Sequence, residues 1–281
     1  MINRFKKFTN FKGIIRDVSF NRASFGLIND TTYHVEKLEE LERTTITKLN
    51  PDKDIIKVDF PETRFFKSQT NKTQIVLHHT VSGRGVDGDI NWWIQDTRRI
   101  ATSKIIDYKG DIHQCFPSEY WAHHLGVTQA FLKSRGFSDY RTRNVELNKQ
   151  SIGIEIDAWG GLVKHTDGKW YPGDWDTKLK RNVPRLNLRA ISEDRVYEYP
   201  RGYRGFYGFE KYTPEQIESL RKLLLYYSHK HDIVLSYNDD MFGISDNALA
   251  GKPGVWSHTS FRRDKSDIHP QSDLVLMLKS F

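Results

Sequence analysis

The sequence predicts an α/β fold in which a mixed β-sheet is flanked by helices. From about residue 72, segments with strand character, such as 74–78 and 151–157, alternate with helical patterns along the chain. Strands interleaved with helices are typical of α/β domains. A chain of 281 residues with 37% hydrophobic residues is also long enough to bury a sizeable core.

Residues 1–65 differ from the rest, and we expect them to form a small N-terminal module or extension. Val35, Leu38 and Leu41 recur at the three-residue step of an amphipathic helix. This part of the sequence contains no group of residues that suggests catalysis or metal binding. An accessory module and a clasp on the main domain, which we place at residues 66–281, fit it equally well.

The main domain should begin with strands and a hairpin. Residues 89–96 are expected to form a short helix, and residues 99–107 a strand. A turn at 108–111 would join this strand to a returning strand at 112–116. A short strand at 255–256 is expected near the end of the chain.

Thr213 marks the clearest helix start. Threonine is a favoured N-cap, Pro214 occupies the first helical position, and Gln216 can close a capping box. Residues 274–278 are expected to lie in a terminal helix. The apolar stripe of the helix that begins after Thr213 consists of Ile217, Leu220, Leu224 and Tyr227.

Residues from about 160 to 211 form a long stretch without a regular hydrophobic period. Gly, Pro, Trp and Tyr occur throughout it. Loops of this length are uncommon inside a compact domain. We therefore expect a functional loop or an insertion with structure of its own.

The charge of the chain limits its partners. Lys and Arg number 43 against 36 Asp and Glu, a formal net charge of +7, which favours an anionic partner. These basic residues are spread along the chain and form no recognisable motif, so we expect no nucleic-acid partner. An anionic polymer such as cell wall fits the charge, and so does a solvated basic surface.

Cys115 is the only cysteine of the chain, which excludes an intrachain disulfide and a cysteine-rich zinc module. A metal ion would therefore be held mainly by histidine and carboxylate. Apolar runs such as 223–227 are far shorter than the roughly 20 residues of a membrane span, so we expect no membrane insertion. The first residues lack the apolar stretch of a secretory signal.

His78 is the last residue of the expected strand at 74–78, and His79 follows it directly. Adjacent strand residues point to opposite faces, so only one of His78 and His79 can aim at a given point. Downstream, His258 is followed nine residues later by Asp267. Two histidines and a carboxylate form a known ligand set for catalytic zinc, with the fourth position left for water. The sequence therefore predicts a zinc site at His78, His258 and Asp267.

Several segments carry a resemblance to a known family. From about Thr73 to Pro270 the chain resembles the zinc-dependent N-acetylmuramoyl-L-alanine amidases, which include phage lysozyme-type amidases and peptidoglycan-recognition proteins. Six segments in the order of the family are more specific than any one of them alone. They are 76–80 (Val-Leu-His-His-Thr), 106–114, 124–126, 148–155 (ending in Ser-Ile-Gly-Ile-Glu), 212–216, and 257–258 with 265–267.

The resemblance implies one zinc ion in a surface groove, with the first histidine of the His-His-Thr segment as a ligand. It favours Asp267 over the rival Asp264 as the carboxylate ligand. It also implies hydrolysis of the amide between N-acetylmuramic acid and L-alanine, with peptidoglycan as substrate. Glu155 matches a general base of some members, and Lys265 matches a lysine that stabilises the oxyanion.

One position departs from the family. Many phage members have a catalytic tyrosine followed by histidine, and the matching residues here are Thr102 and Ser103. Without this tyrosine and histidine, the role of general base falls on Glu155 alone.

The resemblance and the composition also suggest groups that contact substrate. His124 matches a histidine of the family's groove, whereas His79 and His123 are expected to be structural. Tryptophan rings pack well against sugar faces, but they also dominate protein cores, and the two roles are equally open for each ring. The tryptophans in question are Trp92, Trp93, Trp121 and Trp159.

Three functions follow from these predictions. The first is a monomeric phage endolysin, held in the host cytoplasm until lysis or carried by the virion. The second is a peptidoglycan-binding module that does not cut its ligand. The third is a zinc peptidase that cuts the stem peptide with the same metal chemistry.

Overall fold

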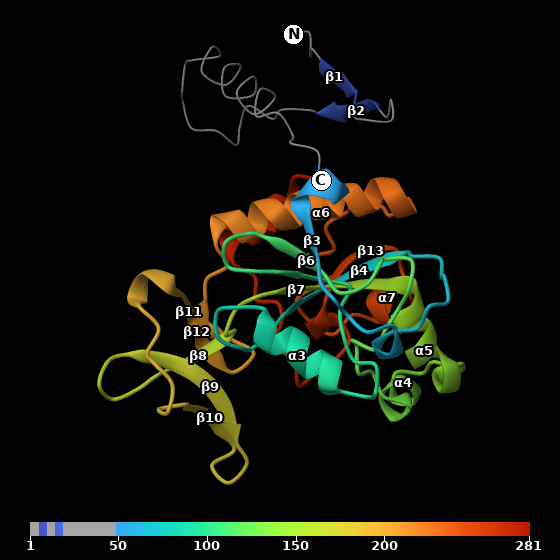
Figure 1. Cartoon of the computed structure of the whole chain (residues 1–281). Helices are drawn as coiled ribbons and strands as arrows, with labels where there is room; N and C mark the ends of the chain where they lie inside the picture. Colours follow the sequence, from blue (N-terminus) through green and yellow to red (C-terminus); the bar gives the residue numbers. More distant parts are fainter. Residues whose placement is uncertain (1–5, 10–14, 19–48) are drawn as a thin grey trace, which may run out of the picture. The chain divides into compact units, whose positions relative to one another are not determined.

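The computed structural model describes residues 6–9, 15–18 and 49–281 (Figure 1). The chain divides into two compact units, Met1–Ile46 and Thr47–Phe281. In the first unit, β1 (Lys6–Thr9) pairs antiparallel with β2 (Ile15–Val18). The helix expected around Val35 lies outside the described residues. Since the second unit begins at Thr47, it includes the segment up to residue 65 that we had assigned to the N-terminal module.

The second unit is built on a mixed six-stranded sheet, which confirms the predicted fold class. Its strand order is β13-β4-β7-β5-β6-β3. β4 runs parallel to both of its neighbours, β5 runs parallel to β7, and β6 is antiparallel to β5. The strands are β3 (Ile55–Lys57), β4 (Gln74–His79), β5 (Lys104–Ile106), β6 (Ile112–Gln114), β7 (Ser151–Ile156) and β13 (Gly254–Ser257).

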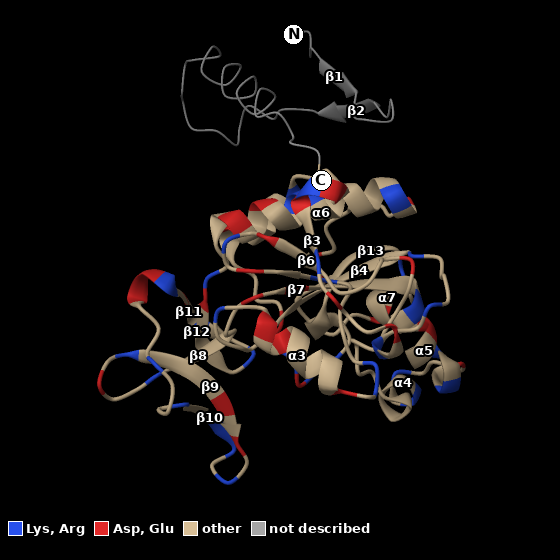
Figure 2. Ribbon diagram, viewed as in Figure 1, with Lys and Arg blue, Asp and Glu red and all other residues tan. Residues whose placement is uncertain are grey.

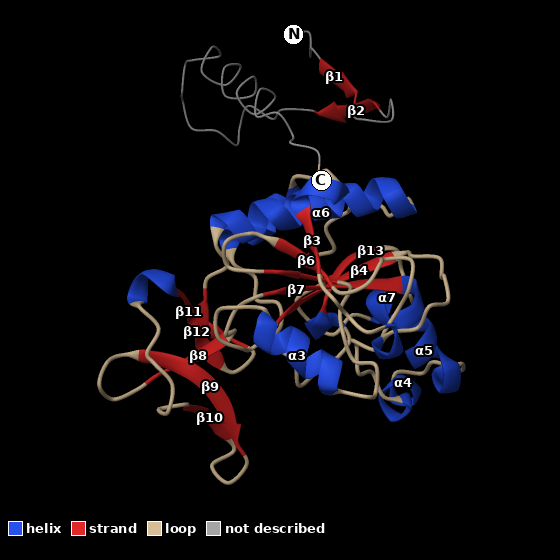
Figure 3. Cartoon of the chain, viewed as in Figure 1, coloured by secondary structure: helices blue, strands red, loops and turns tan. Residues whose placement is uncertain are grey.

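Helices cover both faces of this sheet (Figures 1 and 3). On one face, α6 (Pro214–His231) packs against α8 (Ser272–Lys279) and over β5. The opposite face carries four helices: α3 (Asp87–Gln95), α4 (Gln129–Ser134), α5 (Tyr140–Gln150) and α7 (Asp246–Leu249). Sandwiched in this way, β4 is buried on both faces and β7 is buried except at Glu155, which is partly exposed.

The helix signals at Thr213 are confirmed. Its hydroxyl oxygen accepts from the backbone N–H of Gln216, and the Gln216 side chain accepts from the backbone N–H of Thr213. This capping box satisfies two N–H groups that the first turn leaves unpaired. All four members of the predicted stripe of α6, Ile217, Leu220, Leu224 and Tyr227, are buried in the main core.

The insertion forms a second sheet, which is antiparallel throughout. Its strand order is β10-β9-β8-β12-β11, and the β9–β10 end projects away from the main sheet (Figure 1). A small core of Leu162, Trp170, Ile191 and Val196 stabilises it. Its strands are β8 (Gly161–Lys164), β9 (Trp170–Asp176), β10 (Arg181–Pro184), β11 (Val196–Tyr203) and β12 (Phe206–Glu210).

Short elements complete the second unit: α2 (Pro51–Asp54), η2 (Glu62–Arg64), η3 (Glu193–Arg195) and η4 (His258–Ser260). Over residues 49–281, Lys and Arg are interspersed with Asp and Glu on helices and loops alike (Figure 2). None of the helices in the described part of the chain combines the length and apolar character that a membrane crossing requires.

Candidate metal centre

Parallel strand pairing brings the three predicted ligands together. His78 lies near the end of β4, and β13 pairs beside it with Ser257 opposite Leu77, so His258 emerges next to His78. Asp267 returns on the loop that follows. The Nδ1 atoms of the two histidines are 3.1 Å apart, and the Asp267 Oδ2 atom lies 2.8 Å from Nδ1 of His258 and 3.4 Å from that of His78. These residues form a group that could hold a metal ion.

The spacing of these three atoms suits zinc. Ligands about 2.0–2.1 Å from a tetrahedral zinc ion lie about 3.3 Å from one another. The other ring nitrogen of each histidine already has a partner: Nε2 of His258 is 2.9 Å from the Leu125 carbonyl oxygen, and Nε2 of His78 is 3.0 Å from Nδ1 of His124. When both rings are neutral, their Nδ1 lone pairs therefore face the Asp267 carboxylate, and a metal cation among the three atoms would satisfy all of them.

The electrostatics of the site keep the ligand atoms of His78 and Asp267 unprotonated. Burial, together with the neighbouring His258, lowers the pKa of His78 to about 4. For Asp267, burial favours the neutral acid, but His258 and hydrogen bonds with both histidines outweigh it and hold the pKa well below its usual value. A neutral imidazole and an ionised carboxylate are the forms in which these groups bind metals.

Glu155 lies beside the metal group on the neighbouring strand. In the parallel pairing of β4 with β7, Glu155 is opposite His78, so the two side chains leave the same face of the sheet. Its Oε2 atom is buried and has no hydrogen-bond partner. Burial, followed by the charges of Asp267 and Asp89, raises the pKa of Glu155 well above its usual value.

Lys265 and Asp264 differ in their relation to the site. The Lys265 ammonium is close enough to lower the pKa values of both His78 and Glu155. Asp264 instead forms an exposed ion pair with Arg262, with 2.5 Å between Oδ2 and Nη2. The geometry therefore favours Asp267 over Asp264 as the carboxylate ligand.

The remaining histidines of the predicted motifs take different places. His79 points to the opposite face, where its Nδ1 lies 2.9 Å from the Tyr212 hydroxyl. His123 packs edge-on against the ring of Trp121. His124 contacts His78 through Nδ1 and the Ser151 hydroxyl through Nε2, at 2.8 Å. Its contact with substrate stays a prediction, since both ring nitrogens are engaged within the protein.

The four tryptophans differ in how far they are buried. The side chains of Trp93 and Trp121 are only 7% and 6% exposed, and Trp121 stacks on Phe66 with 3.9 Å between ring centroids. For these two rings the burial favours the core role, and their contact with substrate stays a prediction. Trp159 packs against the core of the insertion. Trp92 on α3 is 52% exposed and is the ring still free to meet a sugar.

Thr102 stands where many phage members of the resembled family have a tyrosine. It is buried, and its hydroxyl donates to the carbonyl oxygen of Lys104 at 3.0 Å. The next residue, Ser103, likewise donates its hydroxyl to the carbonyl oxygen of Phe116. Neither hydroxyl is available as an acid or base at the metal group.

The insertion contacts the segment that carries Asp267, which the sequence analysis did not anticipate. The Tyr203 hydroxyl lies 3.2 Å from the carbonyl oxygens of both Ile268 and Phe242, and shares its one hydrogen between these acceptors. Nε2 of His269 donates to the Glu210 carbonyl oxygen, so its Nδ1 accepts from the Tyr199 hydroxyl at 3.0 Å. The one sequence signal for this contact is that the insertion lies between two segments that resemble the family, 148–155 and 212–216.

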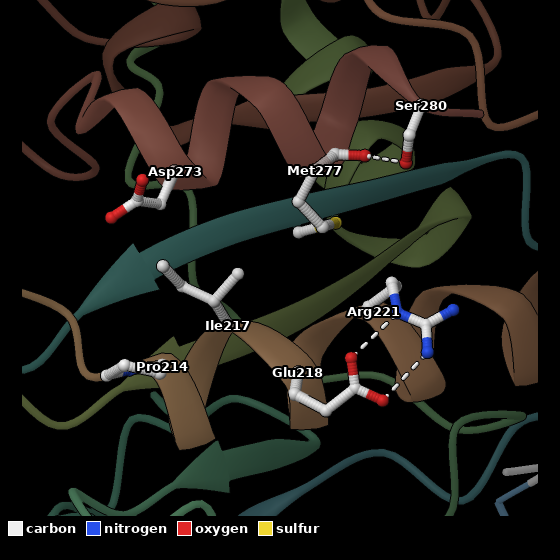
Figure 4. Close-up of a pocket in the computed structure, with 7 residues that line it drawn as sticks. All are labelled: Pro214, Ile217, Glu218, Arg221, Asp273, Met277 and Ser280. Atoms are coloured by element: carbon white, nitrogen blue, oxygen red, sulfur yellow. Dashed lines mark hydrogen bonds and ion pairs between the residues drawn. The ribbon is translucent and has the colours of Figure 1, made fainter. Parts of the chain in front are cut away.

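A hollow of about 380 Å³ between α6 and α8 is a separate feature (Figure 4). Glu218 and Arg221 form an ion pair within it, 2.7 Å apart. It lies on the α6 face of the sheet, whereas His78 faces the other side. Its remaining lining residues are Pro214, Ile217, Asp273, Met277 and Ser280.

Comparisons with known proteins give one family. The family model described as N-acetylmuramoyl-L-alanine amidase matches residues 68–270. No curated protein matches the chain. Among solved structures, the chain is similar to N-acetylmuramoyl-L-alanine amidase LysC from Clostridium intestinale URNW (14% identity, 76% of this chain and 87% of that chain covered, TM-score 0.38). It is also similar to PlyL (12%, 80% and 96%, TM-score 0.41) and Drosophila PGRP-LB (12%, 81% and 93%, TM-score 0.35).

The raised pKa of Glu155 predicts a pH-dependent effect on stability. Its carboxyl keeps a proton in the folded state at pH values where the unfolded state, near the ordinary 4.5, has lost it. Stability is therefore lost as the pH rises above that value. In metal-free protein, Glu155→Gln should raise the denaturation midpoint at neutral pH, and the gain should vanish toward pH of about 4.

Urea denaturation of both proteins in a chelator across this pH range measures the effect. The matched control is Glu146→Gln, since Glu146 is exposed on α5. A gain for Glu155→Gln that does not change with pH would contradict the assignment.

Proposed function

The chain belongs to the N-acetylmuramoyl-L-alanine amidase family, and we propose that His78, His258 and Asp267 hold the zinc ion that serves its reaction. As a member of this family, the protein is an enzyme that hydrolyses the amide between N-acetylmuramic acid and L-alanine in peptidoglycan. The proposal concerns the residues and the metal that carry out this hydrolysis.

One observation carries the zinc assignment. Three buried acceptor atoms, two imidazole Nδ1 atoms and one carboxylate oxygen, lie 2.8–3.4 Å apart. Converging lone pairs at such distances repel one another unless a proton or a metal cation lies among them. Bound there, zinc would supply a Lewis acid that polarises the scissile carbonyl and lowers the pKa of a water molecule.

Glu155 is proposed as the general base. Its position opposite His78 places the carboxyl at the edge of the metal group, and its unpartnered Oε2 can accept a proton. The Asp267 charge is the largest charge effect that raises the Glu155 pKa, so a cation at Asp267 would lower that pKa again. A carboxyl poised there can take a proton from the attacking water and return it to the leaving amine.

Lys265 is proposed as the group that stabilises negative charge on the carbonyl oxygen. It is half-buried, and its charge acts on both His78 and Glu155. A fixed cation near developing charge contributes most where water is largely excluded. Trp92, the exposed ring on α3, is the proposed contact for a sugar face. His124 is proposed as a further contact for the substrate.

We further propose that the protein is a phage endolysin that acts on the bacterial wall as a monomer. The family and the sequence segments that match phage amidases support this role. The net charge of +7 suits an anionic wall. A binding-only role is less favoured because all three ligand side chains are present and converge.

Glu155→Gln should abolish most turnover while zinc is retained. Loss of a general base typically costs about 10²–10⁴-fold in rate, and Glu155 is not among the three metal-binding side chains. The measurement combines zinc analysis with mass spectrometry of the products released from purified sacculi. Turnover equal to wild type would remove Glu155 from the mechanism.

The same products separate the alternative functions. New amino termini on L-alanine identify the amidase. Cuts within the stem peptide would identify a zinc peptidase, and no cleavage by zinc-loaded protein of several wall chemotypes would identify a binding module.

Asp267→Asn and Asp264→Asn should differ sharply in zinc affinity. Asp267 lies within the metal group, whereas Asp264 is exposed and paired with Arg262. The Asp267 variant should lose more than the about 10–100-fold that follows loss of an outer hydrogen-bond partner. The Asp264 variant should bind zinc like wild type. Chelator competition measures both, and the reverse order would make Asp264 the ligand.

A further inference from the structure

Two consecutive residues, His124 and Leu125, each contact one of the two histidines proposed to hold zinc. His124 lies against His78, with 3.0 Å between Nδ1 and Nε2. The carbonyl oxygen of Leu125 lies 2.9 Å from Nε2 of His258. The dipeptide of His124 and Leu125 therefore touches the outer side of both rings, opposite the Nδ1 atoms that face Asp267.

A single buried side chain holds this dipeptide. Asn148, in the last turn of α5, is 4% exposed. Its Oδ1 atom accepts from the backbone N–H groups of His124 at 2.8 Å and Leu125 at 3.1 Å. Its Nδ2 atom donates to the carbonyl oxygen of Asn144 at 2.6 Å. That bond fixes which end of the amide is the acceptor, because the carbonyl oxygen of Asn144 can only accept.

The hydrogen bonds around His124 have one consistent direction. Ser151 donates its single hydroxyl hydrogen to the Leu147 carbonyl oxygen at 2.6 Å. It must therefore accept from Nε2 of His124, which is 2.8 Å away. With its proton on Nε2, neutral His124 accepts at Nδ1, so Nε2 of His78 is the donor. The lone pair of His78 is left on Nδ1, at the metal group.

A single hydrogen bond determines which ring nitrogen of His258 carries a proton. A carbonyl oxygen cannot donate, so Nε2 of His258 carries the proton that Leu125 accepts. In the neutral form of His258, the lone pair is therefore likewise on Nδ1. Gly153 on β7 leaves room for this arrangement, because a Cβ atom there would lie 3.0 Å from Nδ1 of His124.

We propose that Asn148 is a positioning residue for the metal centre: by holding the His124–Leu125 dipeptide, it fixes the tautomer and the direction of both zinc histidines. The inference rests on the proposed zinc site. It gives a physical role to the asparagine in the 148–155 segment, which touches neither metal ligand directly. Partners of this kind orient ligand rings and tune metal affinity.

The first test uses metal-free protein, so its outcome does not depend on zinc or on activity. NMR of protein with ¹⁵N-labelled histidine reports which ring nitrogen carries a proton. In wild type, Nε2 of both His78 and His258 should be protonated. Asn148→Leu, similar in size but without the acceptor, should turn both rings into tautomer mixtures.

Ser151→Ala provides a sharper comparison. This change removes the acceptor of His124 but leaves the Leu125 carbonyl in place, so only His78 should lose its fixed tautomer. The proposal is overturned if His78 or His258 of wild type carries its proton on Nδ1 alone. It is also overturned if Asn148→Leu leaves both tautomers unchanged.

The second test measures zinc affinity by chelator competition. Asn148→Leu should weaken binding by about 10–100-fold, and Asn148→Asp, which keeps an acceptor for both N–H groups, should recover most of the loss. The control is Gln74→Leu, because Gln74 is an equally buried amide that bonds to Ala248 and Lys252 at the other end of β4. Wild-type affinity in Asn148→Leu, or an equal loss in Gln74→Leu, would overturn the proposal.

The two tests separate this inference from the proposed function. If wild-type protein binds no zinc at His78, the proposed function fails, whereas the tautomers of the metal-free protein still decide the role of Asn148. If Asn148→Leu does not fold, Asn148→Ala, which also lacks the acceptor, takes its place in both tests, with Asn148→Asp again expected to recover the loss.

Discussion

Parallel pairing of β4 with both β13 and β7 is the constraint on which the site depends. It places Ser257 opposite Leu77 and Glu155 opposite His78, so groups from three strands meet at one edge of the sheet. Side chains alternate along a strand, and a slip of one residue would turn His79 toward the site instead. The apolar residues that precede His78 are buried on both faces, and this burial holds the register.

Much of this could be predicted from the sequence, because the signals were local and periodic. The mixed sheet and the cap at Thr213 follow from short patterns, whereas the grouping of His78, His258 and Asp267 was predicted from a known zinc ligand set. The helix α5 was not predicted, because it is mostly polar and buries only Leu147 and Asn148. An insertion with its own structure was one of the two alternatives, but its strands were not predicted: Pro172 and Gly173 lie within β9, and neither residue favours a strand. The burial of Trp93 and Trp121 depends on partners distant in sequence, which no local pattern reveals.

The ligand side chains are held from several directions by groups that do not face the metal. Backbone and side-chain acceptors on one side orient the two histidines, as the Leu125 carbonyl does for His258. On the other side, Tyr203 and Tyr199 of the insertion bond to the residues that follow Asp267. The insertion therefore contributes to the frame of the site as well as forming a sheet of its own. Rigid support of this kind keeps converging lone pairs at metal-binding distances.

The central claim is that one zinc ion is bound through Nδ1 of His78, Nδ1 of His258 and a carboxylate oxygen of Asp267. Anomalous diffraction at the zinc edge from crystals of the zinc-loaded protein tests it most directly. The account predicts a single strong peak about 2.0–2.2 Å from each of these three atoms. A peak bound through Nε2 of either histidine, one beside Asp264, or none near His78 would contradict it.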